Sequence, residues 1–331
     1  MKSNAVMLVA AILLSSCPVV SRASETWLFE ARRDYDENNA PTGVALEDVS
    51  GDGVRDLIVG HGSGVSVRLG TGTGGFQGGS EITTGFYAVS VAVTDLDGDG
   101  IRDIVASNKF ESSVSVFMGQ GGGAFGSNVD YDVAMGPCSV AIADFNGDGA
   151  TDLVVANEYA GNASVLLGRG NGTFDARVDY SVGSTPVSVD AGDLNGDGNP
   201  DFVVANNGSA CVSVLLGSAN GSFSPAVNYI AGVRPRSVVI SDLDGDGALD
   251  LAVADQYYDR AQVLMGNGDG TFDASVGYSV ADNPYDITCD DLNGDGIPDL
   301  AAVCRDAHCV SFLLGNGDGS FGARTDYSGC G

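Results

Sequence analysis

The chain has 331 residues and 49 of them are Gly, about twice the usual share for a globular protein. Because Gly destabilises a helix by about 1 kcal/mol relative to Ala, this composition argues against a long helical bundle. Acidic residues outnumber basic ones by 44 to 15, and the formal charge of −29 excludes nucleic-acid binding because phosphate backbones repel it. A hydrophobic share of 44% predicts a folded core rather than a disordered acidic chain.

Residues 1–23 have the pattern of a secretory signal peptide. Lys2 precedes an apolar run over residues 5–14, which is too short to span a bilayer. Two processing sites stay open: cleavage after Ala23, or a lipobox that ends in Cys17 and would leave a lipid-anchored chain. No later apolar run reaches the roughly 20 residues of a transmembrane helix. The sequence therefore predicts a secreted, periplasmic or cell-surface protein.

An acidic segment occurs six times along the rest of the chain. The intervals between successive copies are 47, 49, 49, 49 and 49 residues. Around each copy, short Val-rich runs alternate with turns that contain Gly and Asn, as in residues 152–156 and 164–168 of the third copy. Such runs predict strands joined by tight turns, and no window has a sustained helical period.

Four short antiparallel strands in each repeat predict the blade of a β-propeller. We therefore expect residues 24–331 to form one all-β domain, a six-bladed β-propeller with four-stranded antiparallel blades, with seven blades as the alternative. Residues 29–35 (FEARRDY) resemble residues 321–327 (FGARTDY). Because an open ring leaves a sheet edge unpaired, we expect one copy to complete the last blade, so that the N- and C-terminal strands close the ring.

The acidic segment predicts a calcium-binding loop. Side chains that carry oxygen occupy positions 1, 3, 5 and 9, Gly occupies position 6, and a backbone carbonyl at position 7 is expected to add a ligand. Asp-Gly turns also form without a metal, but the oxygen at position 9 lies beyond the turn in all six copies. An EF-hand is excluded because position 12 is Val or Ala instead of Glu.

The expected ligands would hold about six calcium ions, one in each loop. In the first three loops they are Asp48, Ser50, Asp52, Val54 and Asp56; Asp95, Asp97, Asp99, Ile101 and Asp103; and Asp144, Asn146, Asp148, Ala150 and Asp152. In the last three loops they are Asp193, Asn195, Asp197, Asn199 and Asp201; Asp242, Asp244, Asp246, Ala248 and Asp250; and Asp291, Asn293, Asp295, Ile297 and Asp299.

Six cysteines follow residue 23. Disulfides are expected because an exported chain meets an oxidising environment. The sequence has no C-x-x-C pair of the kind that would indicate a zinc site or redox chemistry. Cys304 and Cys309 flank only four residues and are predicted to form a disulfide across one short loop. The pairing of the other four cysteines stays open.

These repeats resemble the FG-GAP/VCBS repeat, the blade unit also found at the head of integrin α subunits. The loop pattern D-x-[DNS]-x-D-G-x-x-D, the strands DLVVAN and SVLLG, and the turn GNGDGTF carry the resemblance over about residues 29–331. It implies a calcium-stabilised β-propeller with calcium between the first and second strands and ligands on the opposite face. The F-G and G-A-P motifs that name the family occur only as fragments, such as residues 124–126. The resemblance therefore does not imply integrin-like ligands or partner subunits for this chain.

The loops expected on that opposite face differ among the six copies. Their Tyr and Arg side chains are candidate contacts for a sugar or a protein: Tyr87, Arg234, Arg236, Tyr257, Tyr258, Arg260 and Tyr285. The sequence has no nucleophile motif. We expect an exported binding or adhesion module for an extracellular protein or glycan. A propeller-type polysaccharide lyase or another carbohydrate-active enzyme is the alternative, and the oligomeric state stays open.

Overall fold

A computed structural model describes residues 41–84 and 87–328 of the chain. The expected signal peptide (residues 1–23), the N-terminal repeat copy (residues 29–35) and Cys330 lie outside these described residues. Within the described ranges the chain forms 24 strands. The same ranges contain no helix that is both long and apolar enough to cross a membrane.

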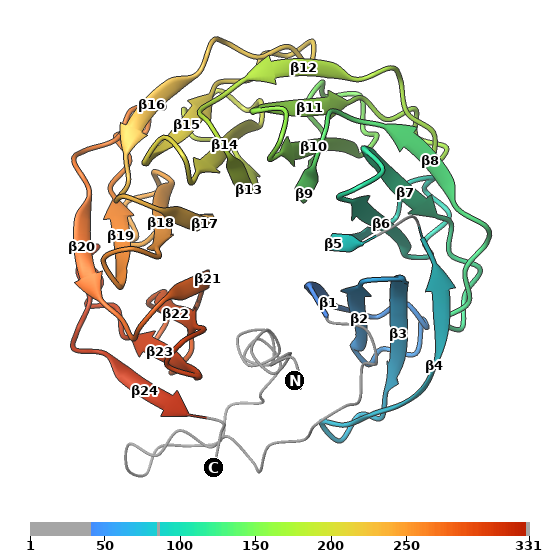
Figure 1. Cartoon of the computed structure of the whole chain (residues 1–331), viewed down its shortest axis with the longest axis horizontal. Helices are drawn as coiled ribbons and strands as arrows, with labels where there is room; N and C mark the ends of the chain where they lie inside the picture. Colours follow the sequence, from blue (N-terminus) through green and yellow to red (C-terminus); the bar gives the residue numbers. More distant parts are fainter. Residues whose placement is uncertain (1–40, 85–86, 329–331) are drawn as a thin grey trace.

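The strands form six antiparallel sheets, each built from four consecutive strands. Figure 1 shows these sheets as blades around a central axis, with the first strand of each blade innermost. The predicted six-bladed β-propeller is therefore confirmed, and the seven-bladed alternative is wrong. Blades 1 to 3 comprise β1 (Gly43–Glu47), β2 (Asp56–His61), β3 (Gly64–Gly70), β4 (Phe76–Thr83); β5 (Ala88–Thr94), β6 (Asp103–Asn108), β7 (Ser113–Phe117), β8 (Val129–Asp132); and β9 (Pro137–Ala143), β10 (Asp152–Asn157), β11 (Asn162–Leu166), β12 (Val178–Ser181). Blades 4 to 6 comprise β13 (Pro186–Gly192), β14 (Asp201–Asn206), β15 (Cys211–Leu215), β16 (Val227–Ile230); β17 (Pro235–Ser241), β18 (Asp250–Asp255), β19 (Arg260–Leu264), β20 (Val276–Ser279); and β21 (Pro284–Asp290), β22 (Asp299–Cys304), β23 (Cys309–Leu313), β24 (Thr325–Ser328).

The outer strand of blade 6, β24, comes from the C-terminal repeat copy and pairs with β23. Blade 6 thus has four strands from consecutive sequence, like the other five. Its N-terminal counterpart, residues 29–35, is outside the described residues, so closure of the ring by paired chain ends stays a prediction.

The burial of each strand explains its residue pattern. The second strand of every blade is buried along its whole length, as in β10, because it lies between two strands of its sheet and, in blades 2 to 5, between two neighbouring blades. A strand covered on both faces needs a continuous apolar run, which is the DLVVAN pattern. The outer strand β12, by contrast, is mostly exposed and contains polar residues. The core lies between blades, where Phe145 and Val154 of blade 3 pack with Phe202 and Leu215 of blade 4.

Hydrogen bonds between blades hold the inner strands together. The hydroxyl oxygen of Ser139 in β9 accepts a bond of 3.1 Å from the backbone N–H of Val189 in β13. Ser90 and Ser188 accept the same kind of bond from the following blade, at 3.3 and 3.2 Å. At the equivalent place in blade 5, Ser237 donates to the Asp286 carboxylate of blade 6 at 2.6 Å. The repeated serine of the inner strand therefore joins each of these blades to the next.

A second link between blades lies at the turn between the third and fourth strands, which we call the glycine-rich turn. The backbone N–H of Gly172 in the turn of blade 3 donates to the carbonyl of Leu96, at position 2 of the acidic loop of blade 2, at 3.1 Å. Gly270 of blade 5 makes the same 3.1 Å bond to Leu194 of blade 4. These turns therefore contact the acidic loop of the preceding blade.

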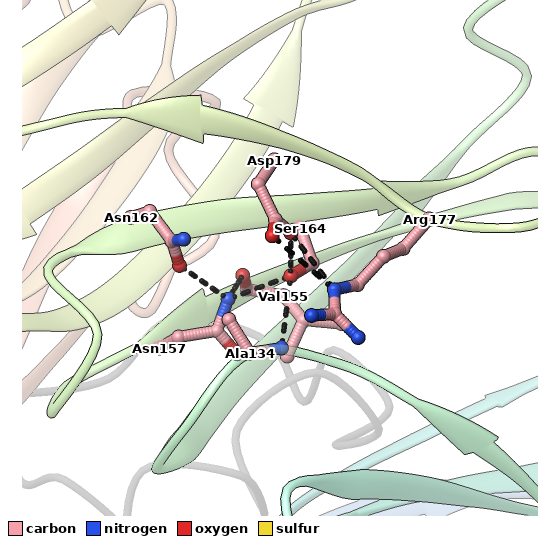
Figure 2. Close-up of polar contacts among 7 residues, drawn as sticks. All are labelled: Ala134, Val155, Asn157, Asn162, Ser164, Arg177 and Asp179. Carbon is pink, nitrogen blue, oxygen red and sulfur yellow. Dashed lines mark hydrogen bonds and ion pairs between the residues drawn. The ribbon is translucent and has the colours of Figure 1, made fainter.

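A polar column crosses the sheet of blades 2, 3, 4 and 6 near the end of the second strand, with its two inner residues buried. In blade 3 it consists of Asn157, Ser164 and Asp179, shown in Figure 2. The Ser164 hydroxyl donates to Asp179 at 2.6 Å and accepts from the Asn157 amide at 2.9 Å and from the Ala134 N–H at 3.2 Å. In blades 2, 3 and 4 the Asn carbonyl oxygen of the column is buried without a hydrogen-bond partner among the described residues.

Replacement of the central serine of this column should destabilise the whole ring. Ser164→Ala removes three hydrogen bonds and leaves the buried Ala134 N–H without an acceptor, while the Asn157 amide keeps its bonds to Val155 and Asn162, so we expect a loss of about 2–3 kcal/mol. Urea unfolding at constant calcium concentration measures this loss. Ser181→Ala, on the exposed part of the same blade, is the matched control, and equal midpoints for both variants would contradict the role of the column.

The predicted Cys304–Cys309 disulfide is not formed, and both residues are free thiols. They face each other across β22 and β23. Cys304 occupies the place of the column asparagine, and its Sγ contacts the Ala302 carbonyl and the Ser311 hydroxyl, both at 3.5 Å. The sequence prediction was wrong because it treated the pair as a loop staple, whereas Cys304 belongs to the polar column of blade 6.

Candidate calcium loops and ligand-binding face

The six acidic loops lie on one face of the ring, because each joins the first strand of a blade to the second. Their backbone closes around the predicted ligands. The carboxylate at position 1 accepts the N–H of position 6 in every loop, at 2.7–3.0 Å, and the carboxylate at position 5 accepts the N–H of position 7, at 2.7–2.8 Å. The glycines need positive φ for this turn, as Gly98 and Gly100 show with 78° and 84°.

In two loops the carboxylates gather closely enough to share one ion. Oxygen atoms of Asp95, Asp97 and Asp99 in blade 2 all lie within 4.8 Å of one another, and so do those of Asp242, Asp244 and Asp250 in blade 5. The other loops have Ser or Asn at position 3 and so offer a neutral oxygen there. This set of oxygen-only donors around a tight turn is the kind that calcium prefers.

The aspartate at position 9, a predicted calcium ligand, also has a structural role that sequence reasoning missed. It is at most 1% exposed in every blade. In blade 4, one oxygen of Asp201 accepts the N–H of Leu194 at 2.9 Å and the other accepts the N–H of Gly217 at 2.6 Å. All six blades repeat both bonds, at 2.7–3.0 Å and 2.6–2.8 Å. This carboxylate therefore ties the acidic loop to the end of the third strand.

The residue at that strand end must be Gly for a steric reason. A Cβ atom on Gly217 would lie 2.2 Å from the carbonyl oxygen of Pro200, which is shorter than any van der Waals contact. The backbone therefore approaches the acidic loop closely enough to donate its N–H to Asp201. The same Gly follows the third strand or ends it in all six blades, an added Cβ would lie 2.1–2.3 Å from a carbonyl oxygen in each, and this contact explains why the Gly recurs.

Burial makes the position-9 carboxylates costly to ionise. Desolvation raises the pKa of Asp152, Asp201 and Asp250 to about 6. The two backbone hydrogen bonds to each carboxylate oppose this rise. Two other acids of the same loop add to it: those at positions 1 and 5 for Asp152 and Asp201, and those at positions 1 and 3 for Asp250. Desolvation also raises the pKa of Asp103 and Asp299. A divalent cation in the loop would favour the charged form, so these residues fit a calcium site.

The opposite face carries the turns between the second and third strands and the connections between blades. Exposed large apolar side chains gather in these turns and connections: Phe110, Met135, Tyr159, Ile230, Val233, Tyr257 and Tyr258. Tyr257 and Tyr258 are 59% and 56% exposed, and Phe110 and Met135 are each 60% exposed. The remaining exposed valines instead recur at the first position of the outer strands. The opposite face therefore has the irregular apolar surface that binding sites often show.

The seven candidate ligand contacts all lie at this face, but they form separate groups. Tyr257 and Tyr258 contact each other, with ring centroids 5.0 Å apart. Arg236 stacks on Tyr285 of the next blade, 4.1 Å from its centroid, and its guanidinium donates to the Tyr285 hydroxyl.

The other three candidates diverge from these two groups. Tyr87 packs on Phe110 in blade 2, across the ring from blades 5 and 6 (Figure 1). The side chain of Arg260 runs over Gly277 of the outer strand β20. Arg234 is exposed, and its backbone N–H donates to Asp255 at 3.1 Å. The sequence therefore identified the face but not the groups within it.

Two further cations belong to this face, and sequence reasoning did not single them out. Arg305 lies 5.6 Å from the Tyr285 ring centroid. Lys109 pairs with Glu158 at 2.5 Å and lies 5.3 Å from the Tyr159 ring centroid. Both lie in the variable turns, which was the available signal in the sequence. The partners of Lys109 come from the next blade, whereas Tyr285 lies in the same blade as Arg305 but about twenty residues earlier in the chain.

Six four-stranded blades with one acidic loop each define a repeat-built β-propeller. An FG-GAP-like repeat model matches residues 48–106, 95–155, 144–204, 193–253 and 242–302, and the chain belongs to this family. No curated protein matches the sequence.

Solved structures with the same fold have low sequence identity to the chain. An Agrocybe aegerita lectin, described by its recognition of non-reducing terminal N-acetylglucosamine, is 20% identical, with 86% of this chain and 79% of that one covered and a TM-score of 0.61. A putative 6-phosphogluconolactonase from Bacteroides uniformis is 16% identical, with 87% and 85% covered and a TM-score of 0.68. A Lactobacillus plantarum protein is 14% identical, with 87% and 85% covered and a TM-score of 0.69. At these identities the likeness establishes the fold alone.

Proposed function

We propose that this protein is an exported β-propeller that binds calcium in its acidic loops and presents the opposite face to an extracellular protein or glycan. The loops are proposed to hold about six ions. The signal-like residues 1–23 support export, and either cleavage after Ala23 or lipidation of Cys17 would leave the ring outside the cytoplasm. The mass of the mature chain recovered outside the cytoplasm checks this part of the proposal.

The observation that carries the binding role is the group of exposed aromatic side chains on the opposite face. Each lies on a short turn held by a rigid sheet, an arrangement that commonly positions binding residues. Two adjacent rings such as Tyr257 and Tyr258 offer a large contact area at a low entropic cost. The lectin propeller with the same fold gives a precedent for a sugar ligand.

A paired substitution tests this role. Glycan and extracellular-protein arrays first identify the ligands that the calcium-loaded chain binds. Tyr257→Ser with Tyr258→Ser should lower the affinity for these ligands by about tenfold or more, because Tyr residues often dominate the binding energy of an interface. The control variant, Val178→Ser with Val227→Ser, removes two exposed apolar side chains from the outer strands. Unchanged binding by the Tyr variant, or equal losses in both variants, would contradict the proposed face.

A further inference from the structure

The arginines of the opposite face lack the carboxylate partners that several other cations of the described residues have. Elsewhere, Arg169, Arg177 and Arg324 pair with Asp175, Asp179 and Asp326 at 2.5–3.2 Å. On the opposite face of blades 2 and 3, Lys109 pairs with Glu158. Arg234, Arg236 and Arg305 of blades 5 and 6 form no ion pair within the described part of the chain. Arg260 of this face and Arg102 of an acidic loop also form no ion pair among the described residues, so the feature that calls for an explanation is the close grouping of arginines on a chain with a charge of −29.

Two of these guanidiniums share one aromatic ring. Arg236 comes from the inner strand of blade 5 and Arg305 from the turn after β22 of blade 6. Their Cζ atoms lie 4.1 and 5.6 Å from the Tyr285 ring centroid. The ring face attracts both cations, so it holds two like charges close together at the junction between blades. Two guanidiniums held in this way are prepared to bind an anionic group with several oxygens.

The carboxylates around these arginines are largely engaged in other hydrogen bonds. Asp286, which follows Tyr285, accepts the Ser237 hydroxyl at 2.6 Å and the Ile287 N–H at 3.0 Å. One oxygen of buried Asp255 accepts the N–H groups of Val233 and Arg234, both at 3.1 Å. Asp259 accepts the N–H of Asn283 at 2.8 Å. The exposed acids Asp282 and Asp306 also lie on these turns, so the patch is mixed in charge, but neither is within ion-pair distance of an arginine.

The turns that carry the arginines are tied to one another. The Gln256 side chain of blade 5 donates to the Asn283 side chain at 2.7 Å. The carbonyl of Asn283 in turn accepts the N–H of Arg305 at 2.9 Å. The backbone N–H of Gln256 donates to the carbonyl of Arg234 at 3.0 Å. The backbones of Arg234 and Arg305 therefore keep a defined spacing, which lowers the entropic cost of binding a ligand across them.

We propose that Arg236 and Arg305 around Tyr285, together with Arg234 and the ring pair Tyr257 and Tyr258 on the adjoining turns of blade 5, bind an acidic glycan through carboxylate or sulfate groups. The inference rests on the proposed function and names the ligand class for that face. A uronic acid or sulfated sugar offers an anionic group to the arginines and an apolar C–H face to the tyrosine rings. An acidic peptide would use the arginines but leave the rings without a matching partner, so the glycan is the better fit.

Binding of soluble polygalacturonate and chondroitin sulfate by the full, calcium-loaded chain tests the inference, with neutral dextran and poly-Glu as comparison ligands. We expect both acidic glycans to bind, and binding to weaken as salt rises. Arg236→Gln with Arg305→Gln should weaken binding by about tenfold or more. Arg169→Gln with Arg177→Gln changes the net charge equally away from this face and should leave affinity within about twofold. Because Arg305 is exposed, Arg305→Gln alone should keep the melting temperature and still weaken binding.

Three outcomes would overturn the inference. The first is an equal loss of binding in the two double variants, which would indicate attraction by charge alone. The second is preferential binding of poly-Glu, which would assign the site to acidic peptides. The third is the absence of acidic-glycan binding by the unmodified chain. If a neutral glycan or a protein still binds and that binding depends on Tyr257 and Tyr258, the acidic-glycan inference fails while the proposed function stands.

Discussion

Removal of calcium should lower the melting temperature of the purified chain by about 10 °C or more. An ion that binds only the folded loop stabilises it by about 2.7 kcal/mol when free calcium is a hundred times Kd. Two filled loops, such as those with three clustered carboxylates in blades 2 and 5, would then contribute about 5 kcal/mol, or roughly 8 °C for a chain of this size, and each further filled loop would add to the shift. Scanning calorimetry of chelator-treated protein, with calcium added back, measures the shift.

Isothermal titration of the stripped protein gives the number of ions, for which we expect about six. Magnesium is the control cation, because it demands a stricter octahedral geometry and should restore less stability. Asp95→Ala with Asp97→Ala should remove one ion from the count and leave the others. Stripped protein that melts at the same temperature and takes up no calcium would refute the calcium proposal while the β-propeller fold remains.

Asp201→Ala should destabilise the calcium-free protein by about 3–5 kcal/mol. The substitution removes the acceptor for two buried N–H groups, those of Leu194 and Gly217, and each unsatisfied buried donor costs about 1–3 kcal/mol besides the cavity left by the side chain. Urea unfolding in the presence of chelator measures this effect without any contribution from bound calcium.

Two companion variants separate the backbone role of Asp201 from ion binding. Asp201→Asn keeps one acceptor oxygen, so it should recover part of the lost stability. Asp197→Ala, at exposed position 5 of the same loop, should leave calcium-free unfolding nearly unchanged and still weaken calcium uptake. If Asp201→Ala and Asp197→Ala have the same unfolding midpoint in chelator, position 9 has no special structural role.

The blade count and the place of the acidic loops were predictable because both depend on local sequence repeated at a fixed interval. The role of Asp201 was not, since its acceptor bonds reach Gly217, sixteen residues further along the chain. The position of Cys304 was hidden for a related reason. Its equivalence to Asn157 depends on the register of strands rather than on the identity of the residue. Sequence spacing made Cys304 a disulfide candidate, whereas strand pairing makes it part of a polar column.

On the opposite face, too, the sequence alone could not predict which side chains contact one another, because several of these contacts form between blades. The sequence placed Arg236 and Tyr285 on one face, but their stacking depends on how blade 5 lies against blade 6. Arg305 joins the same ring from a third segment of the chain. Arg260 was grouped with Tyr257 and Tyr258 because it is close in sequence, yet its side chain runs along β19 and β20. Side-chain direction, which the sequence does not encode locally, decides which candidates meet.

The contact between glycine-rich turns and acidic loops gives the ring a polarity. Gly172 of blade 3 bonds to the loop of blade 2, and Gly270 of blade 5 bonds to the loop of blade 4. An ion held in one loop would thus stiffen the turn of the next blade, and because coupling free energies are reciprocal, a stiffened turn would equally favour an ion in the loop that it contacts. The number of bound ions would then rise more steeply with calcium concentration than it would for six independent sites, because neighbouring repeats in such proteins are energetically coupled.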